Sequence, residues 1–199
     1  MFKLNETLDD EIELDGHTFQ LDLAFDNVLD VFDLFREETD QVLMIYGALQ
    51  LLVINEDKPD ETNPELDELT PEQAIELLNR IIDEHINTDN RQDIVEYDLA
   101  GNEMKRPRSS GDDDRVVSFT WDAEYIWTSF IQAYQIDLHN EFGRLHWRKF
   151  MALFRDLPSE TKIKQIIEIR TWEPDKDTSA KERQRMQKLQ DEFELPEED

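Results

Sequence analysis

Large apolar residues recur three and four positions apart along most of this 199-residue chain, and that spacing constrains the fold more than any other feature. Residues spaced in this way lie on one face of an α-helix, where they can pack against a neighbouring element. The first set is Phe25, Val28, Leu29, Phe32 and Phe35. Because the spacing returns in several later stretches, the chain is predicted to be mainly α-helical.

One segment near the N-terminus has the period of a strand instead. Residues 11–14 and 18–21 alternate polar and apolar side chains, and Asp15-Gly16 separates them. An Asp-Gly pair between alternating runs favours a type I′ turn, because that turn needs a positive φ at both central residues. The sequence therefore predicts a small β-hairpin.

Helix boundaries in the N-terminal half are marked by local signals. Residues 41–54 are apolar nearly all round and predict a central helix, whereas residues 55–69 hold two prolines and seven acids and predict a loop. Thr70-Pro71 with Gln73 forms a capping-box pattern, which predicts a helix that carries four apolar residues: Ile75, Leu78, Ile81 and Ile82.

Four further helices are predicted in the C-terminal half. Thr120 is the expected cap of the first, which runs to Tyr134, and the second contains Phe142 to Phe154 and ends before Pro158. Ser159 begins the third, which carries Ile163, Ile166, Ile167 and Ile169. Ser179 and Glu182 form a capping-box pattern for a last, highly charged helix.

The charge distribution indicates two structural units. Residues 1–100 hold 28 acids and 5 bases, whereas residues 101–199 hold 21 acids and 16 bases. We therefore predict an acidic unit at 1–86, a linker at 87–115 and an aromatic-rich helical unit at 116–199. The expected fold is mainly α, with a helical, bundle-like C-terminal unit and a small N-terminal β-hairpin.

The net charge of −28 argues against two classes of partner. It repels both nucleic-acid phosphates and anionic membrane surfaces, so neither is an expected ligand. The longest apolar run, residues 42–54, is shorter than the about 20 residues that span a bilayer, and the N-terminus lacks the pattern of a signal peptide. A soluble, cytoplasmic protein is expected.

Residue patterns that support catalysis or metal binding are missing from the sequence. There is no cysteine, and His139 and His146 are seven residues apart, about 10.5 Å along a helix, which is too far to share one zinc ion. Asp89 to Asp93 resembles the start of a calcium loop, but Ile94 stands at the required glycine. No phosphate-binding, dinucleotide-binding or hydrolase motif is present. We expect no enzyme activity, no catalytic residue, no cofactor and no metal.

Two features have a functional and a structural interpretation. The aromatic residues between Trp121 and Tyr134 could form a stacking platform for bases or sugars, but at helical spacing they more often form a core. Lys105 to Arg108 could contact phosphate, but in so acidic a chain a linker that offsets nearby acids is the simpler interpretation.

Several motifs between Val117 and Arg170 resemble those of a known family. They are residues 118–127, SFTWDAEYIW, residues 130–138, FIQAYQIDL, residues 145–154, LHWRKFMALF, then Leu157-Pro158 and residues 166–170, IIEIR. They are similar to the motifs of the bacteriophage gene product fifteen family, found in siphophages and prophages of Gram-positive hosts. Arg148 stands where that family has Trp, and Asp156 stands where it has Gly.

The resemblance implies a tail assembly chaperone, because family members are encoded beside the tape-measure gene. The implied partners are the tape-measure protein and the tail tube protein, in the host cytoplasm. A tape-measure protein is a long apolar helix that needs covering, and aromatic grooves can bind such a helix. The candidate contact residues are Trp121, Tyr125, Trp127, Tyr134, Trp147 and Phe154.

Other interpretations stay open at this point. So acidic a chain could mimic nucleic acid and inhibit a host DNA-processing enzyme, or it could be a structural part of the tail. Acids at phosphate spacing on one face would indicate a mimic, whereas an exposed apolar groove would indicate a chaperone. The sequence also leaves homo-oligomerisation open.

Overall fold

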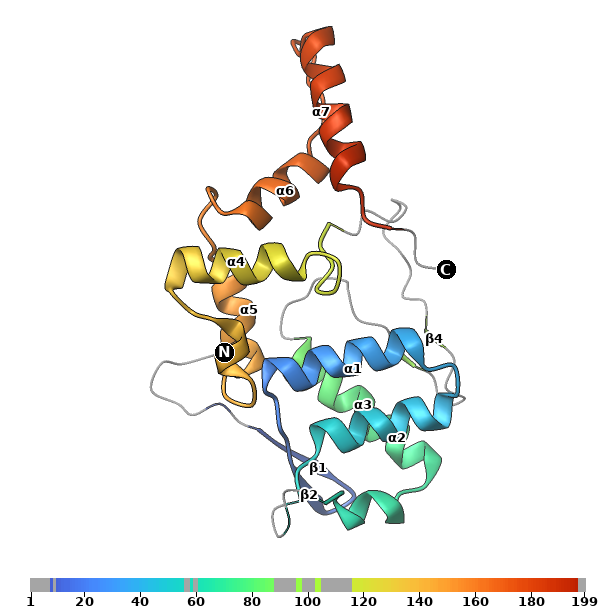
Figure 1. Ribbon diagram of the computed structural model, residues 1–199. Helices are drawn as coiled ribbons and strands as arrows, with labels where there is room; N and C mark the ends of the chain where they lie inside the picture. The colour runs from blue at the N-terminus through green and yellow to red at the C-terminus, as the bar shows by residue number, and fades with distance from the viewer. Residues whose placement is uncertain are drawn as a thin grey trace. The chain divides into compact units, whose positions relative to one another are not determined.

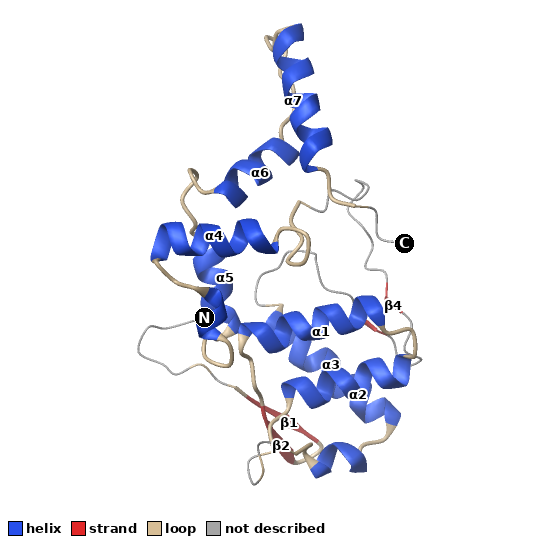
Figure 2. Ribbon diagram, viewed as in Figure 1, coloured by secondary structure: helices blue, strands red, loops and turns tan. Residues whose placement is uncertain are grey.

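The computed structural model describes residue 8 and residues 10–55, 58, 61–87, 96–97, 103–104 and 116–196. Most of these residues are helical, and a two-stranded hairpin lies near the N-terminus (Figure 2), which confirms the predicted fold class. The α-helices are α1 (Phe25–Glu37), α2 (Gln41–Leu52), α3 (Pro71–Ile81), α4 (Ala123–Tyr134), α5 (Trp147–Arg155), α6 (Lys162–Arg170) and α7 (Ala180–Phe193).

The predicted hairpin is confirmed. Strand β1 (Glu11–Leu14) pairs antiparallel with β2 (His17–Gln20), with Leu14 opposite His17. Asp15 and Gly16 have φ values of 51° and 86°, as a type I′ turn requires. The alternation of polar and apolar residues matches the burial of the side chains, because the apolar Ile12, Leu14 and Phe19 are buried.

Residue contacts divide the chain into two compact units. Unit 1 consists of Met1–Arg108 with Phe142–Phe150, and unit 2 consists of Ser109–Glu141 with Met151–Asp199. The first residues of α5 therefore belong to unit 1 and its last residues to unit 2. The domain boundaries predicted at 86/87 and 115/116 stay a prediction, since the predicted linker lies mostly outside the described residues.

In unit 1, α1, α2 and α3 enclose the core (Figure 1). A Cβ on Gly47 of α2 would meet Leu34 Cδ2 of α1 at 3.0 Å, so the glycine permits close packing of these two helices. The capping box at α3 is confirmed, because Gln73 N–H donates to Thr70 Oγ1 and Thr70 N–H donates to Gln73 Oε1.

Four short elements add to the predicted helices and hairpin of this unit. The segment 55–69 contains a 3₁₀ helix, η1 (Pro64–Glu68), where Asn63 caps the helix and Leu66 is buried. A π-helical turn, η2 (Ile82–Ile86), continues α3. Strands β3 (Glu96–Tyr97) and β4 (Glu103–Met104) pair antiparallel.

In unit 2, two predicted helix starts are wrong. Helix α4 begins at Ala123, not after Thr120, because Ser118 holds the preceding turn: its hydroxyl accepts from Trp121 N–H and its carbonyl from Asp122 N–H. Helix α6 begins at Lys162, with Thr161 rather than Ser159 at the N-cap position. The cap of α7 is confirmed, because Ser179 Oγ accepts from Glu182 N–H.

The predicted helix from Phe142 is also wrong at its start. Helix α5 begins at Trp147, because His146, directly before it, forms an antiparallel β-bridge with Ala24. Phe25 N–H donates to Leu145 O at 2.9 Å, and Trp147 N–H donates to Leu23 O at 2.7 Å. His139 lies in a separate 3₁₀ helix, η3 (Leu138–Glu141), so the two histidines do not share a helix.

Candidate partner-binding surface

Trp147 lies in the core of unit 1. Its side chain is 3% exposed, and its ring packs against Phe32 and Phe150, with centroids 5.6 Å away in both cases. The indole Nε1–H donates to Ile86 O at 3.0 Å. Ile86 ends the π-helical turn, so the indole satisfies a carbonyl at a helix terminus.

The residues beside Trp147 reinforce the same attachment. His146 Nδ1 accepts from Arg148 N–H at 3.0 Å, which places the ring proton on Nε2, and Nε2 lies 2.9 Å from Asp10 Oδ1. Arg148 Nη2 donates to Glu84 O at 2.8 Å. The segment His146-Trp147-Arg148 therefore binds Asp10 and two carbonyl groups of the π-helical turn, all in unit 1.

Three more candidate residues make hydrogen bonds or core contacts within unit 2. Phe154 is buried, 8% exposed, and its ring centroid lies 5.7 Å from that of Phe119. Tyr134 is half-buried, and its hydroxyl donates to Leu153 O at 3.0 Å. Trp127 is also half-buried, and its indole donates to Asp137 Oδ1 at 2.8 Å.

The Trp127 hydrogen bond has an electrostatic consequence. It is the main cause that lowers the pKa of Asp137, because the bond favours the charged carboxylate. In contrast, burial and the nearby charge of Asp156 raise the pKa of Tyr134. Trp127 and Tyr134 thus each have a polar partner in unit 2.

The remaining two candidates differ in exposure. Tyr125 is half-buried, with its ring 6.3 Å from Phe193 and Lys162 Nζ 5.8 Å above it. Trp121 is 57% exposed and lies in the turn that precedes α4. Ile131, on α4 itself, is 39% exposed.

We call one exposed region of unit 2 the α4 surface. It consists of Trp121 and Ile131 together with four exposed polar residues, which are Glu124, Thr128, Gln132 and Gln135. Ile131 lies on α4 and Trp121 lies two residues before the helix begins, so the surface includes α4 and the turn that precedes it. The apolar spacing predicted aromatic side chains here, but it did not single out Ile131. Whether any of the six candidates contacts a partner stays a prediction.

Unit 1 also exposes large apolar side chains that the sequence did not single out. Val42 and Leu43, in the first turn of α2, are 58% and 60% exposed, and Phe142 is exposed as well. Because residues 41–54 are apolar nearly all round, their pattern gave no sign of which side faces solvent. The Asp40 carboxylate accepts from both Val42 N–H and Leu43 N–H, which fixes the start of α2.

A buried ion pair holds unit 2 together. Arg170 Nη1 lies 2.7 Å from Asp122 Oδ2, and Arg170 Nη2 lies 2.9 Å from Asp122 Oδ1, while Asp122 is almost fully buried. Arg170 also donates to Val116 O and Phe193 O, and Asp122 accepts from Ser118 N–H. The pair therefore connects α6 with the turn before α4 and with the end of α7.

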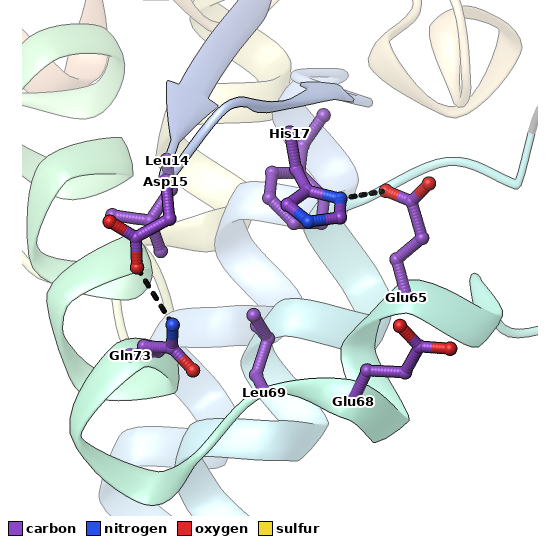
Figure 3. Close-up of a pocket in the computed structure, with 8 residues that line it drawn as sticks. Leu14, Asp15, His17, Glu65, Glu68, Leu69 and Gln73 are labelled. Atoms are coloured by element: carbon purple, nitrogen blue, oxygen red, sulfur yellow. Dashed lines mark hydrogen bonds and ion pairs between the residues drawn. The ribbon is translucent and has the colours of Figure 1, made fainter.

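A small hollow lies in unit 1 (Figure 3). It measures about 110 Å³, and its lining includes the apolar Leu14, Phe19 and Leu69 as well as His17 and Glu65, whose side chains lie 3.8 Å apart. Gln73 Nε2 donates to Asp15 Oδ2 at 2.7 Å across another part of it. Among the residues described, no group of three His, Asp or Glu side chains could hold a metal ion, and no helix is long and apolar enough to cross a membrane.

The exposed side of α1 carries a row of acids, which are Asp26, Asp30, Asp33 and Glu37. Burial is the largest cause that raises the pKa of Asp30, and the charges of Asp26 and Asp33 add to it. The charged form of Asp30 is thus disfavoured in the folded state. A row of like charges at this spacing destabilises a helix slightly.

Asp30→Asn is therefore expected to raise the free energy of unfolding at pH 7, by less than about 0.5 kcal/mol. As pH falls through the raised pKa, Asp30 becomes neutral and its disadvantage disappears. The gain should thus vanish below the unfolded-state pKa of about 3.9. Urea unfolding at pH 7 and pH 3 checks this, and a loss of stability at pH 7 would contradict it.

Comparisons with known proteins give one match over nearly the whole chain. The sequence model of a family described as Bacteriophage Gp15 protein matches residues 4–195. A curated protein of Arabidopsis thaliana, described as putative disease resistance RPP13-like protein 2, is 27% identical over 172 residues, which are 82% of this chain and 20% of that protein. The chain thus spans about a fifth of the length of the curated protein that it matches. No solved structure matches it.

Proposed function

The chain belongs to the bacteriophage Gp15 family, and on that premise we propose that it is a non-enzymatic tail assembly chaperone that binds the tape-measure protein. Family membership itself supports a structural or assembly-related role in a phage. The α4 surface is the observation that supports the chaperone role.

The α4 surface suits an apolar helical partner. It has an exposed Trp in the turn before α4 and an exposed Ile on α4 itself, where a partner could bury apolar area. Trp side chains are frequent anchors of interfaces, because they contribute a large apolar area at a small entropic cost. Trp121 is thus the principal anchor of the proposed interface, and Ile131 is the second.

The net charge supports the other requirement of a chaperone, which is to keep the complex with its partner soluble. A complex with an apolar partner stays soluble when the chaperone carries a large net charge. The −28 charge meets this requirement. In this proposal, the apolar contacts supply affinity and the acids prevent aggregation of the complex.

Trp121→Ala is expected to weaken capture of the tape-measure protein roughly thirtyfold, which corresponds to about 2 kcal/mol for an anchor residue. Its free energy of unfolding should change by no more than about 0.5 kcal/mol, because Trp121 is mostly exposed. The measurement is a pull-down of co-expressed tape-measure protein by the tagged chain, with urea unfolding of the variant alone.

Val42→Ala/Leu43→Ala provides a matched control, because these side chains are as exposed as Trp121 but lie in unit 1. We expect capture by this variant to equal that of the wild type. If the control loses capture and Trp121→Ala retains it, the α4 surface is not the interface. Retention of the chain in purified virions would instead indicate a structural tail component.

Salt dependence separates the chaperone from a nucleic-acid mimic. Apolar contacts change little with salt, whereas contacts between an acidic mimic and a basic cleft weaken strongly as the Debye length falls from about 10 Å at 0.1 M to about 3 Å at 1 M. Capture that persists at 1 M salt is expected here. Salt-sensitive binding to a DNA-processing enzyme, without tape-measure capture, would overturn the proposal.

A further inference from the structure

Helix α7 lies on the outside of unit 2 and adds no side chain to its core. None of its 14 residues is buried. The large apolar side chains Met186, Leu189 and Phe193 lie three and four positions apart, so they share one side of the helix, and all three are only half-buried. The helix therefore has an apolar side that the rest of unit 2 covers incompletely.

The attachment of α7 is near its C-terminal end (Figure 1). Gln190 Nε2 donates to Ile169 O at 3.0 Å and to Trp172 O at 2.9 Å. Arg170 Nε donates to Phe193 O at 2.6 Å. These hydrogen bonds join the last four residues of α7 to the end of α6 and the residues just after it.

Without this attachment the helix itself is marginal. Isolated helices shorter than about 12–15 residues are barely stable in water, and α7 has 14. Ser179 caps its N-terminus and Glu182 suits the positive end of the macrodipole, but the last turn holds Asp191 and Glu192 and no base. Opening of such a segment costs less free energy than the opening of a helix that is packed into a core.

Phe193 covers one edge of the α4 surface. Its ring centroid lies 6.3 Å from that of Tyr125, and Lys162 Nζ lies 4.5 Å from the centre of the Phe193 ring. Tyr125 is the neighbour, along α4, of the exposed Thr128 three positions further on. When α7 leaves, the ring of Tyr125 therefore becomes part of the α4 surface.

We propose that α7 is a displaceable cover, and that an apolar helix of the partner takes its place on Tyr125. The inference rests on the proposed function and states how access to the α4 surface is regulated. Because α7 is itself the occupant of this place, it indicates what fits there: a helix with apolar residues three and four positions apart. Only four of the 14 residues of α7 are apolar, so a largely apolar helix buries more apolar area at the same place.

The proposal predicts the sign of a change in affinity. When only the open form binds the partner fully, the apparent affinity is reduced by the fraction of chains that are open. A change that loosens α7 therefore strengthens capture of the tape-measure protein. If α7 instead served to support the α4 surface, the same change would weaken capture.

Gln190→Ala/Phe193→Ala is the opening variant, because it removes the side-chain hydrogen bonds and the ring that hold α7. We expect it to capture the tape-measure protein about tenfold more tightly than the wild type. Gln184→Ala/Gln187→Ala is the matched control, since both residues are exposed in the same helix, and its capture should equal that of the wild type. Addition of Tyr125→Ala to the opening variant should remove the gain.

Asp191→Asn/Glu192→Gln is the closing variant. It removes two exposed acids from the negative end of the macrodipole, which stabilises α7 as a helix, and should weaken capture about threefold. Glu72→Gln/Glu76→Gln changes the net charge equally at two exposed positions of α3 in unit 1, and its capture should equal that of the wild type.

Hydrogen exchange of the free chain, measured by mass spectrometry, tests the cover without a partner. The amides of α7 should exchange faster than those of α4, still faster in the opening variant and more slowly in the closing variant. Exchange in α7 as slow as in α4 would overturn the proposal, and so would an opening variant that captures no more tightly than a wild-type chain that does capture. A wild-type chain that captures no tape-measure protein would instead overturn the chaperone function.

Discussion

Trp147→Ala is expected to lower the free energy of unfolding by about 3–5 kcal/mol. The change removes a ring that is buried against Phe32 and Phe150 and leaves a cavity in the core of unit 1. It also removes the indole donor from Ile86 O at the end of the π-helical turn. Since many domains are stable by only about 5–15 kcal/mol, the variant should be close to unfolding at 37 °C. Urea unfolding monitored by circular dichroism measures the loss.

Trp147→Phe is the matched variant, because it keeps most of the aromatic volume but cannot donate to Ile86 O. We expect it to lose less than Trp147→Ala, with a remaining cost of about 1–3 kcal/mol for the unsatisfied carbonyl and the smaller ring. Trp121→Ala, in comparison, should cost no more than about 0.5 kcal/mol. Equal losses for Trp147→Ala and Trp121→Ala would contradict the assignment of Trp147 to the core.

Arg170→Met is expected to destabilise the protein by about 3–5 kcal/mol, because it leaves the buried Asp122 carboxylate without its cation. The same change removes the donors to Val116 O and Phe193 O. Arg36→Met is the surface control, since Arg36 pairs with the partly exposed Asp33 and should cost no more than about 1 kcal/mol.

The double variant Asp122→Asn/Arg170→Met tests the cause of that loss. Removal of both charges eliminates the uncompensated carboxylate, so the double variant should be more stable than Arg170→Met alone. Urea unfolding of the two single variants and the double variant gives the coupling energy. Additive losses would show that the ion pair is not the source of the effect.

Local signals in the sequence predicted the elements whose start depends on neighbouring residues. The Asp15-Gly16 turn, the Thr70 capping box and the Ser179 cap each form from residues within three or four positions, and all three are confirmed. The start of α5 was not predictable in this way. The apolar spacing from Phe142 suits a helix, but His146 forms a β-bridge with Ala24, far away in the sequence, and the helix begins only at Trp147.

The same limit applies to the candidate surface. Periodicity identifies an apolar face, but it does not show which other element covers that face. Trp147 is covered by Phe32 from α1, and Trp127 and Tyr134 have polar partners at Asp137 and Leu153. Trp121 belongs to the same aromatic stretch yet is exposed. The exposure of each aromatic residue thus depends on long-range packing, which spacing alone does not specify.

The soluble fraction of the tape-measure protein in cells that co-express it with this chain tests the proposed function most directly. With the wild-type chain, we predict that most of the tape-measure protein is in the supernatant and co-purifies with the chain at 1 M salt. Without the chain, or with Trp121→Ala at the same expression level, most of it should be in the pellet. A tape-measure protein that is equally soluble with and without the chain would contradict the proposed function.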